Sequence, residues 1–167
     1  MFSEAYKEAT LSPDPSTQVG ALIINKTHSV ARGYNHFPNG LHEDQSLKNL
    51  YVSHAEYSCI KNYRRVYSGL NPIGLTMVAT WAACANCAIN IIDAGIKTVY
   101  TDYRIFEFNQ KVRPAHVAME WEQSVHAALD MFEHSGVELF AFDNPFQGYE
   151  HIYKQDPIRV GGKIFTG

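Results

Sequence analysis

Two short segments rich in metal-binding side chains constrain this chain more than any other feature. The first is His54-Ala55-Glu56, and the second is a C-x-x-C pair formed by Cys84 and Cys87. Two cysteines at this spacing, at the start of a helix, can face one metal ion, and a histidine at the start of another helix supplies a third ligand. We therefore expect a fold that brings two helix N-termini together.

The chemistry of this ligand set points to a metal site that activates water. One histidine and two thiolates form a three-ligand zinc site whose fourth position is open to water. Zinc lowers the pKa of bound water from 15.7 to about 7, and a neighbouring carboxylate such as Glu56 can carry the proton. The pattern resembles that of the zinc deaminases, although Ala83 stands where those enzymes have proline before the first cysteine.

Other interpretations of the same residues remain open at this point. A lone C-x-x-C also occurs in redox pairs and in structural zinc modules that serve regulation or assembly. A structural module needs a closed site with four ligands, and the free carboxylate of Glu56 argues against one. The third cysteine, Cys59, falls inside the helix that follows His54. We interpret it as an apolar core residue.

Composition excludes several broader classes of protein. The chain has only three cysteines, an odd number, so we do not expect a disulfide framework. We expect instead that the protein works in a reducing compartment. The net charge of −3 argues against a broad basic surface for nucleic acid. The N-terminus has no signal-peptide pattern, and no apolar run approaches the ~20 residues that cross a bilayer. We therefore expect a cytoplasmic protein.

The order of the expected elements predicts the fold class. We expect helices at 2–11, 53–66, 84–94 and 114–135, and strands at 19–25, 29–34, 75–81, 97–101 and 137–142. Two strands followed by helix–strand alternation indicate an α/β sandwich around a mixed five-stranded sheet. We expect one domain over residues 1–167, in which 143–167 form a C-terminal extension of unassigned role.

Several segments, taken together, resemble the cytidine and deoxycytidylate deaminase family. The likeness spans about residues 14–139. It is carried by residues 14–21 (DPSTQVGA), 33–40 (GYNHFPNG), 51–56 (YVSHAE), 81–88 (WAACANCA), 91–96 (IIDAGI) and 121–137. The resemblance implies a three-layer α/β/α fold and a homo-oligomer, often a hexamer. His36, where the family more often has glycine, and Ala83 suggest a side branch.

The resemblance also implies a role for particular residues. It makes His54, Cys84 and Cys87 the zinc ligands and Glu56 the proton shuttle. It also implies four substrate contacts. Asn35 would bind the sugar, Val19 would lie where the pocket wall meets the base, Tyr103 would be an aromatic residue near the base, and Ala55 would be a further substrate-binding residue.

A pyrimidine mononucleotide, dCMP above all, is the substrate that the resemblance favours. Phosphate donors are expected from Ser16-Thr17-Gln18 and from the segment that holds Arg104 and Arg113. The alternatives are a deaminase of another base or of a nucleoside, and an editing deaminase that binds nucleic acid, which the net charge disfavours. A second metal site at His36 and His42 is a further alternative to structural roles for these two histidines.

Overall fold

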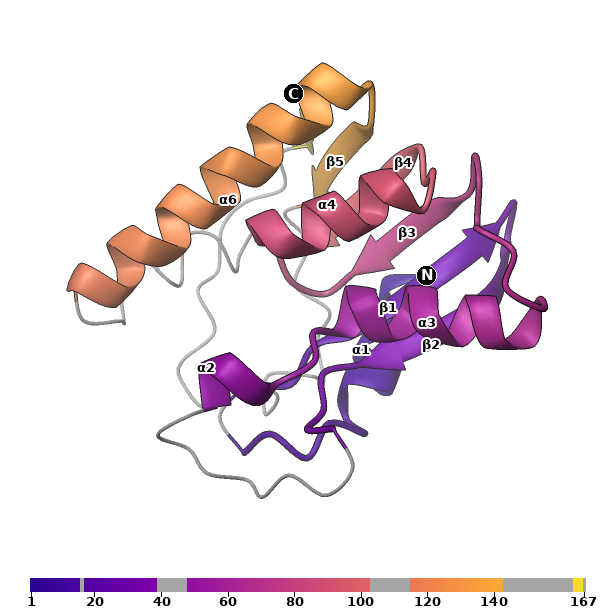
Figure 1. Cartoon of the computed structure of the whole chain (residues 1–167), viewed down its shortest axis with the longest axis horizontal. Helices are drawn as coiled ribbons and strands as arrows, with labels where there is room; N and C mark the ends of the chain where they lie inside the picture. The colour runs from indigo at the N-terminus through magenta and orange to yellow at the C-terminus, as the bar shows by residue number, and fades with distance from the viewer. Residues whose placement is uncertain (16, 39–47, 103–114, 143–163, 167) are drawn as a thin grey trace.

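The computed structural model describes residues 1–15, 17–38, 48–102, 115–142 and 164–166. These form one sheet with helices on both of its faces (Figure 1). The strands are β1 (Gly20–Asn25), β2 (His28–Tyr34), β3 (Thr76–Ala79), β4 (Thr98–Asp102), β5 (Glu138–Phe142) and β6 (Ile164–Thr166). The helices are α1 (Phe2–Ala9), α2 (Lys48–Tyr51), α3 (Ala55–Val66), α4 (Ala85–Asp93) and α6 (Ala115–Ser135).

The sheet is mixed and has the strand order β2-β1-β3-β4-β5-β6. Strand β1 pairs antiparallel with β2 and with β3, whereas β3, β4 and β5 run parallel to one another. The five predicted strands are thus confirmed. A sixth strand was missed: β6, three residues from the C-terminal extension, pairs antiparallel with β5.

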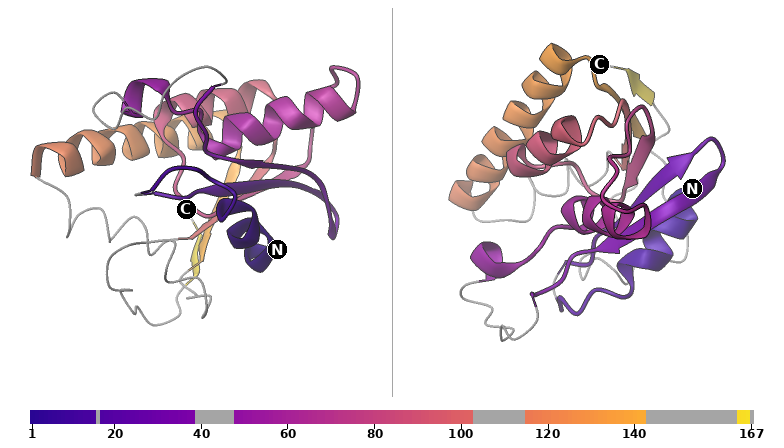
Figure 2. Two further views of the ribbon diagram at one scale, coloured as in Figure 1. Left: turned by 90° about the horizontal axis from the view of Figure 1, so that it is seen from below. Right: turned by 45° about the vertical axis from the view of Figure 1, so that its right-hand side comes forward.

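Alternating side chains along β1 explain why helices cover both faces of the sheet. Ala21 and Ile23 belong to the large core cluster beneath α3, α4 and α6, whereas Leu22 and Ile24 pack with Ala5 of α1. Successive residues of a strand point to opposite faces, so a strand that is apolar throughout needs cover on each side. Figure 2 shows α1 on one face and α3, α4 and α6 on the other. The three-layer α/β/α sandwich is confirmed.

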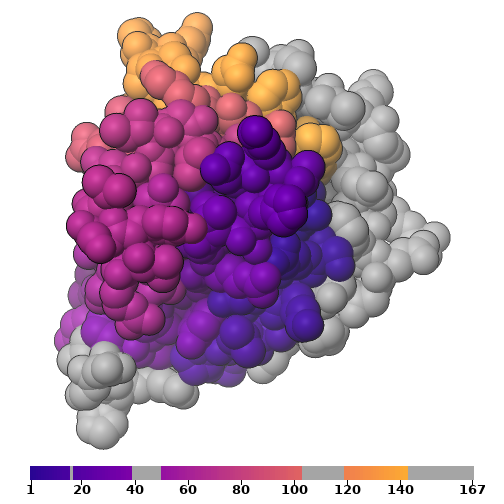
Figure 3. Space-filling model, turned by 90° about the vertical axis from the view of Figure 1, so that its right-hand side faces the viewer, coloured from indigo at the N-terminus to yellow at the C-terminus, as the bar shows by residue number. Residues whose placement is uncertain are grey.

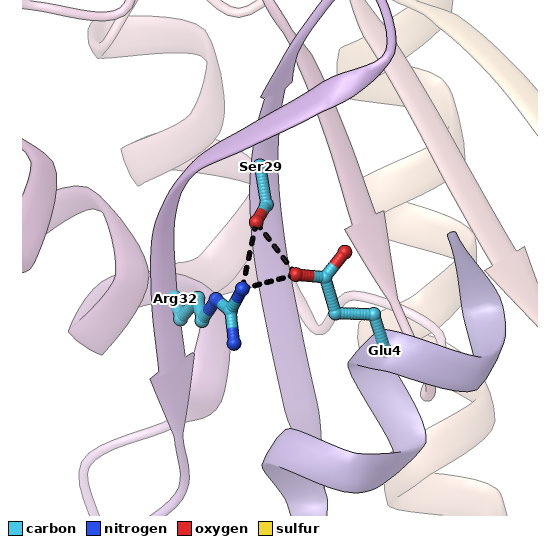
Figure 4. Close-up of polar contacts among 3 residues, drawn as sticks. All are labelled: Glu4, Ser29 and Arg32. Atoms are coloured by element: carbon cyan, nitrogen blue, oxygen red, sulfur yellow. Dashed lines mark hydrogen bonds and ion pairs between the residues drawn. The ribbon is translucent and has the colours of Figure 1, made fainter.

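Both buried and exposed polar contacts join helix α1 to the sheet. The buried Tyr6 hydroxyl donates a hydrogen bond to the carboxylate of Asp102 at the end of β4. On the surface, Glu4 contacts Arg32 and accepts a 2.7 Å hydrogen bond from Ser29 (Figure 4). Exposed ion pairs contribute about 1 kcal/mol or less. The buried contact and apolar packing therefore hold α1 in place.

Helix α3 lies against β2 with backbone touching backbone. A Cβ atom added at Gly33 would come within 2.3 Å of the Cys59 nitrogen and 2.7 Å of the Ala55 oxygen. Both atoms belong to the first turns of α3, next to His54 and Glu56. In the space-filling view of Figure 3, atoms of the α3 region lie directly beside those of the β1–β2 hairpin. Glycine at position 33 therefore sets how close the start of α3 comes to the sheet.

We expect Gly33→Ala to displace the start of α3 and impair the site that this helix carries. Overpacking costs about 1–3 kcal/mol of stability, and a misplacement of about 1 Å can cost roughly 10²-fold in rate. Denaturant unfolding and turnover measure the two effects. Gly20→Ala is the matched control, because the three atoms nearest its added Cβ all belong to α1 and not to α3, with the Ala5 oxygen at 2.1 Å. Equal turnover per folded molecule in both variants would contradict the prediction.

Candidate metal centre and substrate pocket

His54 and Glu56 lie at the N-terminal end of α3. His54 is the N-cap residue, with an extended backbone (φ −71°, ψ 154°) that ends the preceding segment and starts the helix. Glu56 is in the first turn and is only 3% exposed. Acidic residues are stabilised at this end of a helix by the dipole and by free N–H groups. The helix start thus presents an imidazole and a carboxylate to the same region.

Cys84 and Cys87 lie at the N-terminal end of α4. Cys84 is the N-cap residue, again with extended backbone (φ −79°, ψ 170°), and Cys87 is in the first turn. Both thiols are buried. Helices α3 and α4 lie side by side on one face of the sheet (Figures 1 and 2). The two helix N-termini therefore meet, as the sequence predicts.

The ligand atoms of His54, Cys84 and Cys87 fit a tetrahedral metal site. The Nδ1 atom of His54 lies 3.3 Å from Cys87 Sγ and 3.5 Å from Cys84 Sγ, and the three ligand atoms lie within 4.8 Å of one another. Zn–S bonds of about 2.3 Å and Zn–N bonds of about 2.0–2.1 Å, at a tetrahedral angle, place nitrogen and sulfur about 3.6 Å apart. The observed separations match the edges of such a site.

The electrostatics of the cluster favour the thiolate that metal binding needs. A hydrogen bond from Cys87, and then one from His54, lowers the pKa of Cys84 to about 4. The hydrogen bond with Cys84 raises the pKa of His54 to about 8, against the opposing effect of burial. The same pairing raises the pKa of Cys87. One thiol is therefore ionised readily, and a divalent cation would stabilise the second as thiolate.

Glu56 has the properties of a general acid–base group. Burial, the largest effect, raises the pKa of its carboxyl above the usual value, and the nearby His54 partly opposes this. A buried carboxyl with a raised pKa holds a proton more readily than an exposed one, which suits a group that transfers protons.

A cavity of about 320 Å³ opens beside the cluster, a size that suits a small ligand. Its lining comes from three parts of the fold: the region before β1 and after β2, the starts of α3 and α4, and one face of α6. The lining residues are Asp14, Thr17, Val19, Asn35, Val52, His54, Ala55, Glu56, Trp81, Ala82, Cys84, Asn86, Glu120, Trp121 and Ser124. His54, Cys84, Glu56 and the predicted contacts Val19, Asn35 and Ala55 thus share one pocket.

Asn35 is held rigidly by hydrogen bonds to the segment before β1. Its Oδ1 accepts from the Val19 N–H at 2.7 Å, and its Nδ2 donates to the Thr17 carbonyl at 2.9 Å. The carboxylate of Asp14, only 1% exposed, lies 3.5 Å from the same Nδ2 and accepts from the Thr17 N–H at 3.0 Å. Asp14, a pocket residue that the sequence did not single out, therefore orders this wall.

Helix α6 supplies a wall that the sequence analysis did not foresee. Glu120, Trp121 and Ser124 line the pocket from one side of this helix. Trp121 packs edge-on against Trp81, with ring centroids 6.2 Å apart. In the described part of the chain, the indole N–H of Trp121 is buried and meets no acceptor.

The charge of the pocket is unexpected for a phosphate-binding site. Three carboxylates line it, from Asp14, Glu56 and Glu120, and no lysine or arginine occurs among its described lining residues. Of the three expected phosphate-loop residues, Thr17 lines the pocket, whereas the Gln18 amide donates to the Ser12 carbonyl at 2.8 Å. Ser16, Arg104 and Arg113 lie outside the described residues, as do Tyr103 and His42.

Two residues outside the pocket, His36 and Cys59, have structural roles. The sequence left such a role open for His36 and predicted a core position for Cys59. His36 Nδ1 lies 3.2 Å from Ser58 Oγ, and its backbone pairs with Ser53 in an isolated antiparallel bridge. His36 therefore holds the segment that leads into His54. Cys59 is fully buried in the core, and burial raises the pKa of its thiol.

Comparison with solved structures identifies the fold. The chain superposes on the crystal structure of dCMP deaminase from the cyanophage S-TIM5 in complex with dCMP and dUMP, with a TM-score of 0.60 and 23% identity. The match covers 83% of this chain and 91% of that one. The fold is therefore that of the cytidine deaminases. None of the described helices is long and apolar enough to cross a membrane.

Sequence comparison identifies the family. Residues 1–102 match the model of the cytidine and deoxycytidylate deaminase zinc-binding region. A deaminase encoded in the region 3′ of luxG in Aliivibrio fischeri is 31% identical over 143 residues, which cover 83% of this chain and 88% of that protein. The chain belongs to the cytidine and deoxycytidylate deaminase family.

Among the relatives with a named substrate is the deoxycytidylate deaminase of Pongo abelii. It is 36% identical over 107 residues, which cover 57% of this chain and 58% of that enzyme. The chain thus spans somewhat over half the length of this relative.

Proposed function

We propose that this protein is a zinc-dependent deaminase that hydrolyses dCMP to dUMP and ammonia. The observation that carries the proposal is the convergence of His54, Cys84 and Cys87 beside the buried carboxylate of Glu56, at the wall of a ligand-sized pocket. A site with three ligands and an acid–base group suits hydrolysis rather than a structural role. Membership of the deaminase family supports the same reaction.

In this proposal each residue has a defined task. His54, Cys84 and Cys87 would hold the zinc ion, which would supply a water whose pKa is lowered to about 7. Glu56 takes one proton from the attacking water and passes it to the ring nitrogen. It then takes the second proton from the added hydroxyl and delivers it to the leaving amine. Water adds to the carbon that bears the amine, the C–N bond breaks, and ammonia leaves.

The walls of the pocket position the pyrimidine for this reaction. Val19 and Ala55 offer apolar contacts to the base, and Asn35 offers its amide to the sugar. The hydrogen bonds of Asn35 to the Val19 N–H and the Thr17 carbonyl hold that amide in place. A side chain fixed before binding loses little conformational entropy when the ligand arrives. Tyr103 completes the proposed set of contacts.

Ammonia release from a panel of compounds tests the proposed reaction. The panel holds dCMP, CMP, deoxycytidine, cytidine, guanine and dAMP, each assayed with the zinc-loaded protein. We expect dCMP to give the highest kcat/KM. Release from guanine or dAMP but from none of the cytosine compounds would overturn the assignment.

A homo-oligomer is also part of the proposal. Light scattering of the purified protein measures its molar mass and so the number of chains.

A nucleoside deaminase is the second candidate, and one observation favours it. The described wall of the pocket carries the carboxylates of Asp14, Glu56 and Glu120 and no lysine or arginine. Carboxylates repel a phosphate dianion, and the repulsion grows where water is excluded. A neutral nucleoside would meet no such repulsion.

The ratio of rates on dCMP and deoxycytidine separates the two candidates. Hydrogen bonds to a charged group contribute about 1.5–3 kcal/mol each, and 1.36 kcal/mol is tenfold in rate. Two phosphate contacts should therefore favour dCMP by at least ~100-fold in kcat/KM. Steady-state rates at fixed ionic strength measure the ratio. Equal values would indicate that the protein lacks a phosphate site and would favour the nucleoside deaminase.

A further inference from the structure

Helix α4 starts with an N-cap residue that does not cap it. Cys84 occupies the N-cap position and makes no side-chain capping hydrogen bond. Its Sγ lies instead near His54 Nδ1, at 3.5 Å. The first N–H groups of a helix have no partner within the helix, and a side chain at the N-cap usually satisfies one of them. In α4 the N-cap side chain, Cys84, belongs to the ligand cluster instead.

Ser124 of α6 supplies an acceptor for one of the free N–H groups at this helix start. The backbone N–H of Ala85, the first residue of α4, donates to Ser124 Oγ at 3.0 Å. The two residues are 39 positions apart in the sequence. Because Ala85 lies directly after Cys84, this bond holds the backbone at the point where the first thiol leaves the helix.

The same face of α6 also supports the chain before Cys84. Trp121 lies three residues before Ser124, so both side chains lie on one side of the helix. The Trp121 ring packs edge-on against the ring of Trp81, with centroids 6.2 Å apart. Trp81 lies three residues before Cys84. Helix α6 thus contacts the metal-binding segment on both sides of its first cysteine.

We propose that Ser124 is a positioning residue for the cysteine pair. Through Ala85 it holds the start of α4 so that the thiols of Cys84 and Cys87 face His54 before metal arrives. This inference rests on the proposed zinc site. It extends the site to α6, which lies beyond the matched family region of residues 1–102. Partners that orient metal ligands typically change metal affinity or activity by about 10–100-fold when removed.

Zinc affinity of the Ser124→Ala variant tests the proposal directly. We expect the affinity, measured by competition with a chelator of known zinc affinity, to fall about 10–100-fold. With saturating zinc, we expect kcat to fall by a larger factor than KM rises, because Ser124 acts on the ligands through Ala85 in addition to lining the pocket. Ser135→Ala is the matched control. Among the described residues, the Ser135 hydroxyl bonds within α6, to the Phe132 carbonyl at 3.2 Å, and its removal should leave zinc affinity unchanged.

A volume-matched pair separates positioning from packing. Ser124→Thr keeps the hydroxyl acceptor and should retain most of the affinity. Ser124→Val has nearly the same shape without the acceptor and should lose affinity as Ser124→Ala does. If Thr and Val variants bind zinc equally well, or Ser124→Ala binds like wild type, the proposal is overturned. A wild-type protein that binds no zinc would instead overturn the proposed function.

Discussion

Glu56→Gln is expected to abolish nearly all turnover while the fold and the bound metal persist. The amide has the same shape as the carboxylate but cannot accept and return a proton. General acid–base catalysis is worth about 10²–10⁴-fold, and the proposed mechanism uses Glu56 for several transfers. We therefore expect kcat to fall by at least this range. Ammonia release, with metal content measured on the same samples, gives the result.

The control for this variant is Glu122→Gln. Glu122 is a carboxylate of α6 that is not among the lining residues of the pocket, and it lies 3.7 Å from His126 on the helix surface. Its neutralisation should leave kcat within a factor of about two, as for surface substitutions that change free energies by less than about 0.5 kcal/mol. A loss of less than about tenfold in Glu56→Gln would remove Glu56 from the proton-transfer role.

Cys87→Ala is expected to lose the metal and stability together. Wild type should hold about one zinc ion per chain, since three ligand atoms converge on one point. A ligand that binds only the folded state stabilises it by about 4.1 kcal/mol at a thousandfold excess over its Kd. For a chain of this size, that corresponds to a fall in Tm of roughly 8–16 °C. Elemental analysis and thermal unfolding measure the two quantities.

Cys59 provides the matched control for the ligand assignment. It is a third buried cysteine, on α3, and it is not part of the cluster. Cys59→Ala should keep one zinc ion per chain, and a chelator should lower its Tm as it does in wild type. In Cys87→Ala the chelator should have no further effect. Full zinc content in Cys87→Ala would refute the ligand set.

The sequence could predict the site residues whose positions depend on neighbouring residues in the chain. His54 and the cysteine pair each occupy the start of a helix, a position that local patterns mark well. The bounds of α3 and α4 also agree with the expected ranges to within about two residues, the usual uncertainty of helix ends. The meeting of the two helix starts then follows from their shared face of the sheet.

The parts that escaped prediction depend on contacts between distant segments. Ser124 meets Ala85 across 39 residues, and no local pattern marks a serine in the middle of a helix as a cap for another helix. Asp14 acts through the backbone of its own loop and through Asn35, which the sequence places 21 residues away. Short elements were missed as well. Four residues (α2) and three residues (β6) are too few for periodicity to detect.

The backbone contact at Gly33 has a consequence for how sequences of this kind can diverge. Side chains elsewhere in a core change volume during evolution, and helices packed through them shift in response. At the start of α3, no side chain of β2 separates helix from strand at Gly33, so the distance is insensitive to such changes. Drift in the surrounding core can therefore proceed while the carboxylate of Glu56 keeps its depth in the pocket.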